Sequence, residues 1–389
     1  MKITGIDCHV LLAPNYDKTL TSSAQDSFIV VIQTDAGIRG YGESDVNPWI
    51  AKACIEAPGT HTMSLSLRDI LIGSDPLNIE ELWQRMYVGT CMHGRRGAGI
   101  HTMGAIEMAL WDIKGKAEGK PVYELLGGAK QESIVPYASL QPSGNSFAAY
   151  RDSLCVWAER AKGLGFKAVK AEVTMNGPYA HSGLNESFDR HTEVVAAVRK
   201  TLGPEIALMV DVQYMWNDAA TALETVGQWK EFDLFFLETP IWVDNLDEYA
   251  LLHDAAPMKI ASGEWLATHW EFEELIERGK IDVAQPDVGR VGGFIEAKKV
   301  CDFAASRGRV IVPHCWKTGL SVTATAHLAF NTPHCAFIEY LPPHLCVETL
   351  RRELVQEGFD FVEGRILPPQ KPGLGIEMND EVLHRYKVA

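Results

Sequence analysis

The sequence lacks long runs of positive charge and long apolar segments. No run of lysine or arginine exceeds two residues, and 36 Lys and Arg face 51 Asp and Glu, which gives a formal net charge of −15. Because nucleic-acid affinity comes largely from clustered cations, we expect no nucleic-acid partner. Apolar runs such as residues 28–32 fall far short of the roughly 18 residues that a membrane helix needs. We therefore expect no membrane association.

The chain also lacks the marks of a secreted protein. Its eight cysteines include no Cys-x-x-Cys pair, and in a chain of 389 residues they do not resemble a disulfide framework. The first residues alternate like a strand, without the apolar segment and small-residue cleavage site of a signal peptide. We therefore predict free, mostly buried thiols and a soluble, cytoplasmic protein.

Composition and length predict a folded chain of two domains. Hydrophobic residues make up 46% and charged residues 22% of the chain, close to globular averages of about 45–50% and about 25%. Up to about residue 130, strand patterns over 3–12 and 27–34 precede helical patterns over 78–87 and 103–118. Pro and Gly residues within 119–128 then end the helical pattern. This first part is predicted to be an α+β module.

From about residue 133 the pattern changes to alternating strands and helices. Eight short apolar runs alternate with helical patterns and Gly or Pro stops, as expected of a (β/α)8 barrel of about 200–250 residues. A doubly wound open sheet is the alternative, but no glycine-rich dinucleotide turn follows the first strand. The predicted strands are 133–140, 167–173, 206–213, 234–238, 259–264, 281–287, 310–314 and 336–339.

Ionisable residues fall at or near the ends of these predicted strands. From Asp211 to Glu339, successive members lie 27, 26, 23, 27 and 25 residues apart, about the length of one strand–helix unit. A buried charge is costly unless it has a partner or faces the barrel mouth, where barrel active sites lie. We therefore predict that these residues surround an active site. They are Lys170, Glu172, Asp211, Glu238, Glu264, Asp287, His314 and Glu339.

Three acids of this ring, Asp211, Glu238 and Glu264, end three consecutive predicted strands. Each alone is more often just the N-cap of the next helix or the partner of a nearby arginine than a functional residue. Together they would repel one another, and a divalent cation relieves that repulsion. Carboxylate oxygens favour a hard ion, so we predict Mg²⁺ rather than Zn²⁺.

Asp287 and His314 end the next two predicted strands. The carboxylate is placed to hold one imidazole nitrogen, which leaves the other nitrogen as a base or acid near neutral pH. Lys170, on the opposite side of the ring, is the candidate for a second proton-transfer group or an electrostatic helper. A solvated lysine is the alternative.

Short motifs recur in a fixed order along the chain, each weak alone. They are residues 105–116, Lys170-Ala171-Glu172, Asp211-Val212-Gln213, Leu237-Glu238-Thr239-Pro240, Ser262-Gly263-Glu264, Gln285-Pro286-Asp287, Val312-Pro313-His314 and Ile338-Glu339. In this order and spacing, the sequence resembles the mandelate racemase subgroup of the enolase superfamily over almost its whole length. The resemblance implies an α/β fold, with an N-terminal α+β capping domain (residues 1–130) over a modified TIM barrel, (β/α)7β (residues 131–344). The C-terminal segment 345–389 is expected to pack back on the capping domain.

The resemblance also implies roles for the ring. Asp211, Glu238 and Glu264 match the metal ligands of the family. Asp287 with His314 matches its catalytic dyad. Glu339 matches the acid that hydrogen-bonds the carboxylate of the bound substrate.

One position departs from the family pattern, which is commonly Lys-x-Lys on the second barrel strand. Here Glu172 replaces the second lysine, which disfavours two-base racemisation and leaves His314 as the main proton abstractor. Glu172 is then expected to recognise substrate hydroxyls or to accept a hydrogen bond from Lys170. Gln213, where the pattern often has Asn, is expected to hydrogen-bond substrate or water.

The expected chemistry begins with removal of the proton next to a carboxylate, and Mg²⁺ stabilises the resulting enediolate. Protonation of the adjacent hydroxyl by His314 then expels water. We therefore predict a Mg²⁺-dependent hydro-lyase, an acid-sugar dehydratase that converts an aldonate or aldarate into a 2-keto-3-deoxy acid. A racemase or epimerase of a 2-hydroxy acid, using the same chemistry, is one alternative. A non-catalytic barrel that keeps a metal site is the other.

By the same resemblance, substrate specificity is expected to come from residues 14–27 and 93–96 of the capping domain. Arg95 or Arg96 would bind a second carboxylate and favour an aldarate, with a surface arginine as the alternative. Trp316 would instead shorten the pocket and favour a pentonate such as lyxonate. The expected partner is a small acid sugar, and the resemblance suggests a homo-oligomer.

Overall fold

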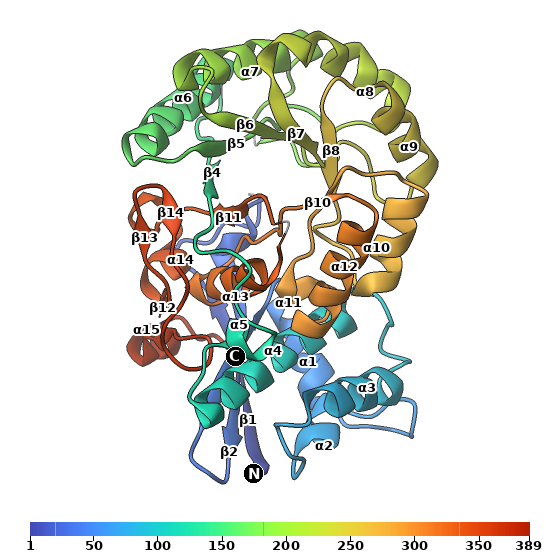
Figure 1. Ribbon diagram of the computed structural model, residues 1–389, viewed down its shortest axis with the longest axis vertical. Helices are drawn as coiled ribbons and strands as arrows, with labels where there is room; N and C mark the ends of the chain where they lie inside the picture. Colours follow the sequence, from blue (N-terminus) through green and yellow to red (C-terminus); the bar gives the residue numbers. More distant parts are fainter. Residues whose placement is uncertain (20, 182, 334) are drawn as a thin grey trace.

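The computed structural model describes residues 1–19, 21–181, 183–333 and 335–389. An antiparallel sheet with helices forms the N-terminal part, and a curled parallel sheet surrounded by helices forms the larger part (Figure 1). The predicted fold class, a TIM-barrel-like α/β fold with an N-terminal capping domain, is confirmed. No helix within the described ranges is both long and apolar enough to cross a membrane.

The N-terminal sheet has the strand order β1-β2-β3. Its strands pair antiparallel, and the long helix α4 packs against β3. A Cβ on Gly42 would lie 1.8 Å from the carbonyl oxygen of Ala105, so only glycine lets β3 approach α4 this closely. The elements are β1 (Ile3–Leu12), η1 (Ser23–Gln25), β2 (Asp26–Thr34), β3 (Arg39–Ser44), α1 (Pro48–Glu56), α2 (Leu67–Leu71), α3 (Ile79–Gly89), α4 (Ala98–Glu118) and α5 (Val122–Leu125).

The barrel sheet contains eight parallel strands among the described residues, in the order β10-β9-β8-β7-β6-β5-β4-β11. A parallel bridge between Ile311 and Cys335 joins β10 to the segment before β11 and closes the ring. Seven of the eight predicted apolar runs contain one of these strands, and the eighth, 336–339, overlaps β11, which extends to Tyr340. The strands are β4 (Pro136–Leu140), β5 (Ala168–Glu172), β6 (Ala207–Asp211), β7 (Leu234–Glu238), β8 (Lys259–Ser262), β9 (Val283–Ala284), β10 (Val310–Ile311) and β11 (Ile338–Tyr340).

Helices cover the outside of the barrel (Figure 1), and a small apolar cluster that includes Tyr137, Met209 and Phe236 packs in its interior. Because both faces of each strand are buried, the strands read as continuous apolar runs. The helices are α6 (Phe147–Gly163), α7 (Phe188–Leu202), α8 (Ala219–Val226), η2 (Gly227–Phe232), α9 (Leu246–Ala255), α10 (Thr268–Glu277), α11 (Val288–Val291), α12 (Phe294–Ser306) and α13 (Gly319–Asn331).

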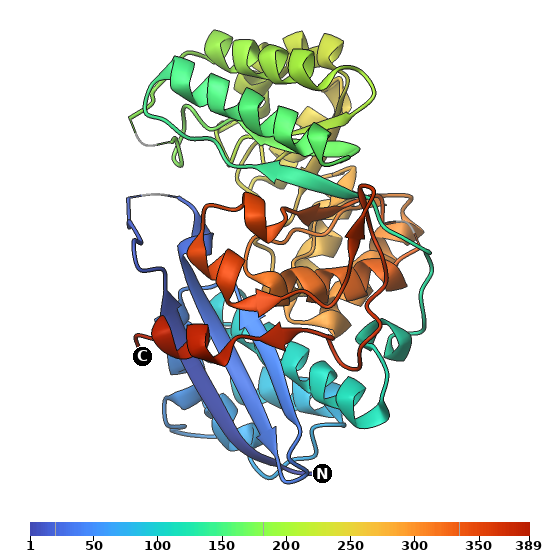
Figure 2. The same ribbon diagram turned by 90° about the vertical axis from the view of Figure 1, so that its left-hand side faces the viewer.

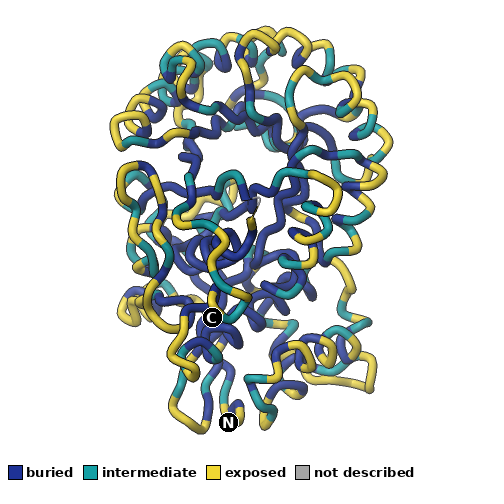
Figure 3. The backbone as a smooth tube through the Cα atoms, viewed as in Figure 1, coloured by how far each residue is buried: buried dark blue, intermediate teal, exposed yellow. Residues whose placement is uncertain are grey.

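Helix α13 is buried along its whole length (Figure 3). It lies between the barrel and the N-terminal sheet, where one oxygen of Glu43 on β3 accepts hydrogen bonds from Thr318 Oγ1 and Ser321 Oγ, both at 2.8 Å. These buried contacts fix the N-terminal part over the barrel, close to the strand ends that carry the ionisable ring.

The C-terminal segment returns to the first strand of the chain (Figure 2). Val388 N donates to Val10 O at 2.9 Å, and Val10 N donates to Ala389 O at 3.0 Å. We propose that residues 345–389 and 1–130 form one capping unit over a barrel of residues 131–344. The elements after β11 are η3 (Pro343–Leu345), which leads into this segment, and α14 (Thr349–Glu353), β12 (Val355–Gln356), β13 (Phe361–Val362), β14 (Arg365–Ile366), β15 (Glu377–Met378) and α15 (Asp380–Arg385) within it.

Candidate active site

A cavity of about 280 Å³ lies at the carboxyl ends of the barrel strands. Most of the predicted site residues line it. Glu238 and Asp287 do not, but each contacts a lining residue: Glu238 contacts Lys170, and Asp287 contacts His314. The predicted residues that line the cavity are Lys170, Glu172, Asp211, Gln213, Glu264, His314, Trp316 and Glu339.

Lys170 is held among carboxylates at the end of β5. Its Nζ lies 2.6 Å from Oε1 of Glu238, 3.1 Å from Oε1 of Glu339 and 4.0 Å from Oδ2 of Asp211. Burial alone would lower the pKa of Lys170, but these carboxylates outweigh burial and hold the pKa well above its usual value. A lysine that stays protonated serves as a fixed positive charge and not as a base.

Strand register places two of the predicted metal ligands side by side. Asp211 and Glu238 are directly paired residues of β6 and β7. Thr239 Oγ1 donates to Asp211 at 2.8 Å, and Gln285 Nε2 donates to Glu238 at 2.7 Å. Burial raises the pKa of Asp211 to about 6, with Glu264 adding to the effect and Lys170 opposing it. Burial likewise raises the pKa of Glu238 to about 8, against the opposing effect of Lys170 and with Asp211 adding to it.

Glu264, the third predicted ligand, follows β8 by two residues. Its Oε1 accepts a hydrogen bond from Tyr214 Oη at 3.0 Å, and its Oε2 lies 3.1 Å from His314 Nε2. Arg290 Nη1 lies 3.6 Å from the same oxygen. Glu264 therefore faces both the other acids and the imidazole.

The donor chemistry of these three residues fits Mg²⁺. Asp211, Glu238 and Glu264 supply carboxylate oxygens, the donor atoms that Mg²⁺ prefers. As their side chains lie, no three His, Cys, Asp or Glu residues in the described ranges converge as a ready-made metal-binding group. The set thus fits the ion by chemistry, while its carboxylates point to Lys170, Tyr214 and His314.

His314 and Asp287 form a buried pair. Nδ1 of His314 lies 2.7 Å from Oδ2 of Asp287, and Gly289 N donates to Oδ1 of Asp287 at 2.8 Å. Burial and Arg290 act to lower the pKa of His314, but the hydrogen bond to Asp287 and the charges of Glu339 and Glu264 raise it to about 9. The second nitrogen, Nε2, lies 3.1 Å from Glu264 Oε2, and the His314 side chain lines the cavity.

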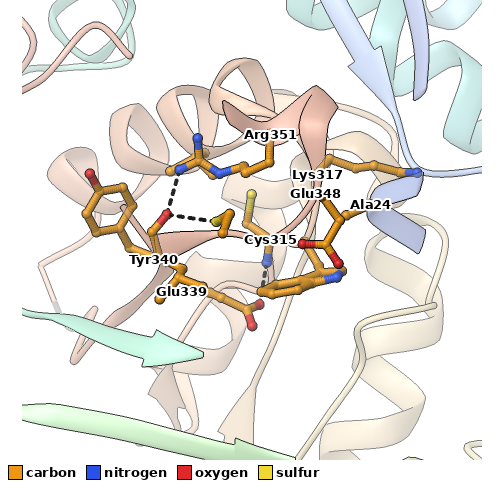
Figure 4. Close-up of a pocket in the computed structure, with 11 residues that line it drawn as sticks. Ala24, Cys315, Lys317, Glu339, Tyr340, Glu348 and Arg351 are labelled. Carbon is orange, nitrogen blue, oxygen red and sulfur yellow. Dashed lines mark hydrogen bonds between the residues drawn. The ribbon is translucent and has the colours of Figure 1, made fainter. Parts of the chain in front are cut away.

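Glu339 ends the ring on the last strand. Its Oε1 pairs with Lys170, and its Oε2 accepts the backbone N–H of Cys315 at 3.0 Å (Figure 4). His314 Nε2 lies 3.8 Å from Oε2. Glu339 therefore lies between the fixed lysine and the imidazole. The small pocket drawn in Figure 4 holds only about 10 Å³, which is space for about one water.

Glu172 does not accept a hydrogen bond from Lys170, which was one of the two roles predicted for it. Thr174 Oγ1 donates to Glu172 at 2.9 Å, and Lys170 pairs instead with Glu238 and Glu339, which are nearer its ammonium group. Burial raises the pKa of Glu172 to about 7, with Asp211 and, more weakly, Glu348 adding to the effect. Glu172 faces the cavity with an oxygen available to substrate hydroxyls.

The predicted cationic contact at Arg95 is not found at the cavity. Arg95 is exposed and does not line it. Arg96 pairs with Glu271 at 3.1 Å and lies over Trp270, because this stretch before α4 packs against α10 on the outside of the barrel. The guanidinium that does line the cavity belongs to Arg290, which pairs with Asp45 and is 6% exposed. Its position three residues after Asp287 is the sequence signal that could have identified it.

The loop before β2 reaches the cavity. Thr19, Thr21, Ser22 and Ser23 line it, whereas residue 20 of the predicted 14–27 loop lies outside the described residues. Sequence reasoning missed Gln141, which follows β4, and Glu348, at the N-cap of α14; both line the cavity. Neither belongs to a motif, and no spacing rule could have brought them together.

Strained backbone supports the floor of the site. Gln213, Tyr214 and Thr239 have φ values of 43°, 60° and 44°, a conformation that costs a non-glycine residue about 1–3 kcal/mol. Tyr214 N donates to Thr239 O, which ties the two loops together. This arrangement turns the Gln213 side chain toward the cavity.

Comparison with known proteins places this geometry in context. A mandelate racemase/muconate lactonizing enzyme N-terminal domain model matches residues 7–127, and an enolase C-terminal domain-like model matches residues 154–382. Arabinonate dehydratase of Saccharolobus solfataricus is 30% identical over 374 residues, which cover 95% of this chain and 93% of that protein. D-Galactarolactone cycloisomerase of Agrobacterium fabrum is 29% identical over 398 residues, which cover 100% of this chain and 99% of that protein.

A solved structure agrees with these matches. The 3,6-anhydro-D-galactonate cycloisomerase from Zobellia galactanivorans superimposes with a TM-score of 0.85 and 28% identity, covering 100% of both chains. The similarity therefore extends over the N-terminal part, the barrel and the C-terminal segment.

Proposed function

Because the chain belongs to the mandelate racemase/muconate lactonizing enzyme family of the enolase superfamily, we propose that it is a Mg²⁺-dependent dehydratase of an acid sugar. The substrate is an aldonate or aldarate, and the product is a 2-keto-3-deoxy acid. Dehydratases of sugar acids among its relatives, such as arabinonate dehydratase, support the reaction class. The observation that carries the proposal is the buried His314–Asp287 pair beside the Lys170 cluster in one cavity.

His314 performs both proton transfers. Its neutral form takes the α-proton of the substrate at Nε2, while Asp287 holds Nδ1 and stabilises the resulting imidazolium. The C–H electron pair first passes into the carboxylate group as an enediolate. It then forms the C2–C3 double bond as the C3–O bond breaks. The imidazolium returns its proton to the departing hydroxyl, which leaves as water, and the enol becomes the 2-keto acid. One base doing both steps requires the proton and the hydroxyl on the same face of the substrate.

Fixed charges orient the substrate carboxylate. Lys170 presents a cation toward the substrate carboxylate, and Glu339, whose Oε1 lies 3.1 Å from Lys170 Nζ, holds that cation in place beside it. Asp211, Glu238 and Glu264 would hold Mg²⁺, which members of the superfamily generally use. Bound there, the ion supplies positive charge that offsets the negative charge developing on the carboxylate as the α-proton leaves.

Glu172 disfavours racemisation. Two-base racemisation needs a second base on the face opposite His314, and the ammonium group of Lys170 is paired with Glu238 and Glu339 at 2.6 Å and 3.1 Å. A cycloisomerase is one further candidate function, which the similarity to two cycloisomerases favours. In that reaction the same α-proton abstraction is followed by loss of a ring oxygen, so the substrate is a lactone or anhydro sugar acid.

A substrate panel tests the proposal. The Mg²⁺-loaded protein is incubated with aldonates, aldarates and sugar lactones, and 2-keto acid formation and α-proton exchange are measured by NMR. A 2-keto-3-deoxy acid from an open-chain acid sugar is the expected result. Ring opening of a lactone alone would favour the cycloisomerase. Exchange on a 2-hydroxy acid alone would favour a racemase, and neither turnover nor exchange would contradict all three.

A further inference from the structure

One part of the cavity, where the ends of β4, β5 and β6 meet the loop before β2 and the N-cap of α14, carries acids and neutral polar groups. Glu172, Glu348, Gln141, Ser22 and Gln213 line this part. Within the described ranges, Lys317 and Arg351 line the small adjoining pocket with Glu348, but Lys317 is paired with Asp26 and Asp45, and Arg351 is paired with Glu357. The cavity cations in those ranges, Lys170 and Arg290, are each already paired with carboxylates near the barrel strands. A ligand group in this part therefore meets acceptors and hydroxyls without a free cation.

Glu348 is fixed in place by two other segments of the chain. Gln141 Nε2 lies 2.7 Å and 2.6 Å from its two carboxylate oxygens, and Ser22 Oγ donates to Oε1 at 3.1 Å. These contacts join the loop before β2, the end of β4 and the C-terminal segment. A carboxylate held by two partners is pre-positioned to act on a ligand instead of swinging out to solvent.

Glu348 lines the same part of the cavity as Glu172, and Gln141 links the two. Leu140 of β4 pairs with Ala171 of β5, so Gln141 and Glu172 follow next to each other along neighbouring strands. Gln141 holds Glu348, which brings the two carboxylates to one part of the cavity. Both carboxyl groups accept hydrogen bonds from hydroxyl groups, and the carboxylate of Glu348 repels a second negative charge.

We propose that the site selects monocarboxylate acid sugars, the aldonates, over dicarboxylate aldarates, and that Glu348 is a specificity-determining residue for this choice. The inference rests on the proposed function and narrows its substrate class. The terminal hydroxyl of an aldonate donates to these acids. The second carboxylate of an aldarate would face them with no cation to neutralise it, and like charges placed together cost several kcal/mol, or about 100-fold or more in affinity.

Matched substrate pairs test this proposal. The Mg²⁺-loaded wild-type protein is titrated with aldonates and aldarates of the same length and configuration, and Kd is measured by calorimetry alongside kcat/KM. The wild type is expected to favour the aldonate of each productive pair by about 100-fold. Glu348→Gln, which keeps the shape and can still bond to Ser22 and Gln141, is expected to narrow the preference by about tenfold, the equivalent of about 1.4 kcal/mol.

Glu353→Gln is the control, because this substitution removes one negative charge from the same C-terminal segment. The carboxylate of Glu353 contacts Tyr386 and Arg385, away from the cavity. It is expected to leave the preference unchanged. The inference is overturned if aldarates bind to the wild type as tightly as aldonates do, or if Glu348→Gln keeps the full wild-type preference for aldonates. Either result would leave acid-sugar dehydration intact. Folded protein that binds and converts neither class would overturn the inference together with the proposed function.

Discussion

Nδ1 of His314 lies 2.7 Å from Oδ2 of Asp287, and the other oxygen of Asp287 accepts the N–H of Gly289. The backbone contact fixes the carboxylate, and the carboxylate fixes the ring. Nε2 is thereby directed to the region between Glu264 and Glu339. In the proposed reaction, this orientation is what lets one nitrogen remove a proton and then return it.

Asp287→Asn is expected to lower kcat by about 10²–10⁴-fold with a smaller change in KM. The Asn oxygen keeps the bond to Gly289, and its NH₂ group then faces Nδ1, which forces the ring proton onto Nε2 and removes the base. Steady-state kinetics on the best substrate of the panel measure the effect. A variant with kcat within a factor of about two of the wild type would contradict this role.

Mg²⁺ is expected to stabilise the protein against unfolding, by about 2–3 kcal/mol at 100 times its Kd. Thermal melts with Mg²⁺ and with EDTA measure this. Asp211→Asn is expected to lose most of the response, because it removes one carboxylate of the proposed set. Without metal this variant is expected to be at least as stable as the wild type, because it relieves repulsion among buried acids.

Asp218→Asn is the matched control for that experiment. Asp218 lies on the same loop after β6, where it caps α8 through Thr221, and asparagine caps equally well. Its Mg²⁺ response is expected to match that of the wild type. An Asp211→Asn protein that still gains the full stabilisation would remove Asp211 from the proposed metal site.

Substrate recovered from D₂O is expected to retain its configuration at the α-carbon. With Glu172 in place of a lysine and Lys170 held protonated, deuterium enters only from the His314 face. NMR and chiral chromatography of unreacted substrate at partial conversion check this expectation. Accumulation of the α-epimer would show a second base and favour the racemase alternative.

The architecture could be predicted from sequence because local pattern determines it. Barrel strands buried on both faces are continuous apolar runs, and their terminal charges mark the mouth. The cavity walls were harder to predict, because Gln141, Glu348 and Arg290 acquire their positions from contacts between segments far apart in the chain. Arg95 shows the converse. It was expected at the cavity but is exposed, and its neighbour Arg96 contacts Glu271 and Trp270 of α10 outside the cavity.

Acid is expected to destabilise the fold partly through His327. Tyr123 N donates to its Nδ1, and Nε2 bonds to Leu374 O, both at 3.1 Å. Burial lowers the pKa of His327 to about 4, so between pH 6.5 and 4 the unfolded chain binds a proton that the folded chain does not. The stability associated with the neutral ring is therefore full above pH 6.5 and is lost as pH falls, by about 2 kcal/mol at pH 5.

His327→Gln tests this expectation, because glutamine can accept and donate in the same places without titrating. The free energy of unfolding is measured by urea denaturation at pH 7 and at pH 5. The loss of stability between the two pH values is expected to be about 2 kcal/mol smaller in this variant than in the wild type. His384→Gln, at an exposed position, is the control. Equal losses in the wild type and His327→Gln would assign the pH dependence to other groups.

The central claim is that His314 dehydrates an acid sugar. One measurement tests it most directly: the NMR time course of a responsive acid sugar in D₂O with Mg²⁺, comparing the wild type with His314→Asn. The account predicts a 2-keto-3-deoxy acid from the wild type, and a loss of both turnover and α-proton exchange by about 10³-fold or more in a folded, Mg²⁺-binding variant. Near-normal product formation by His314→Asn would contradict the account.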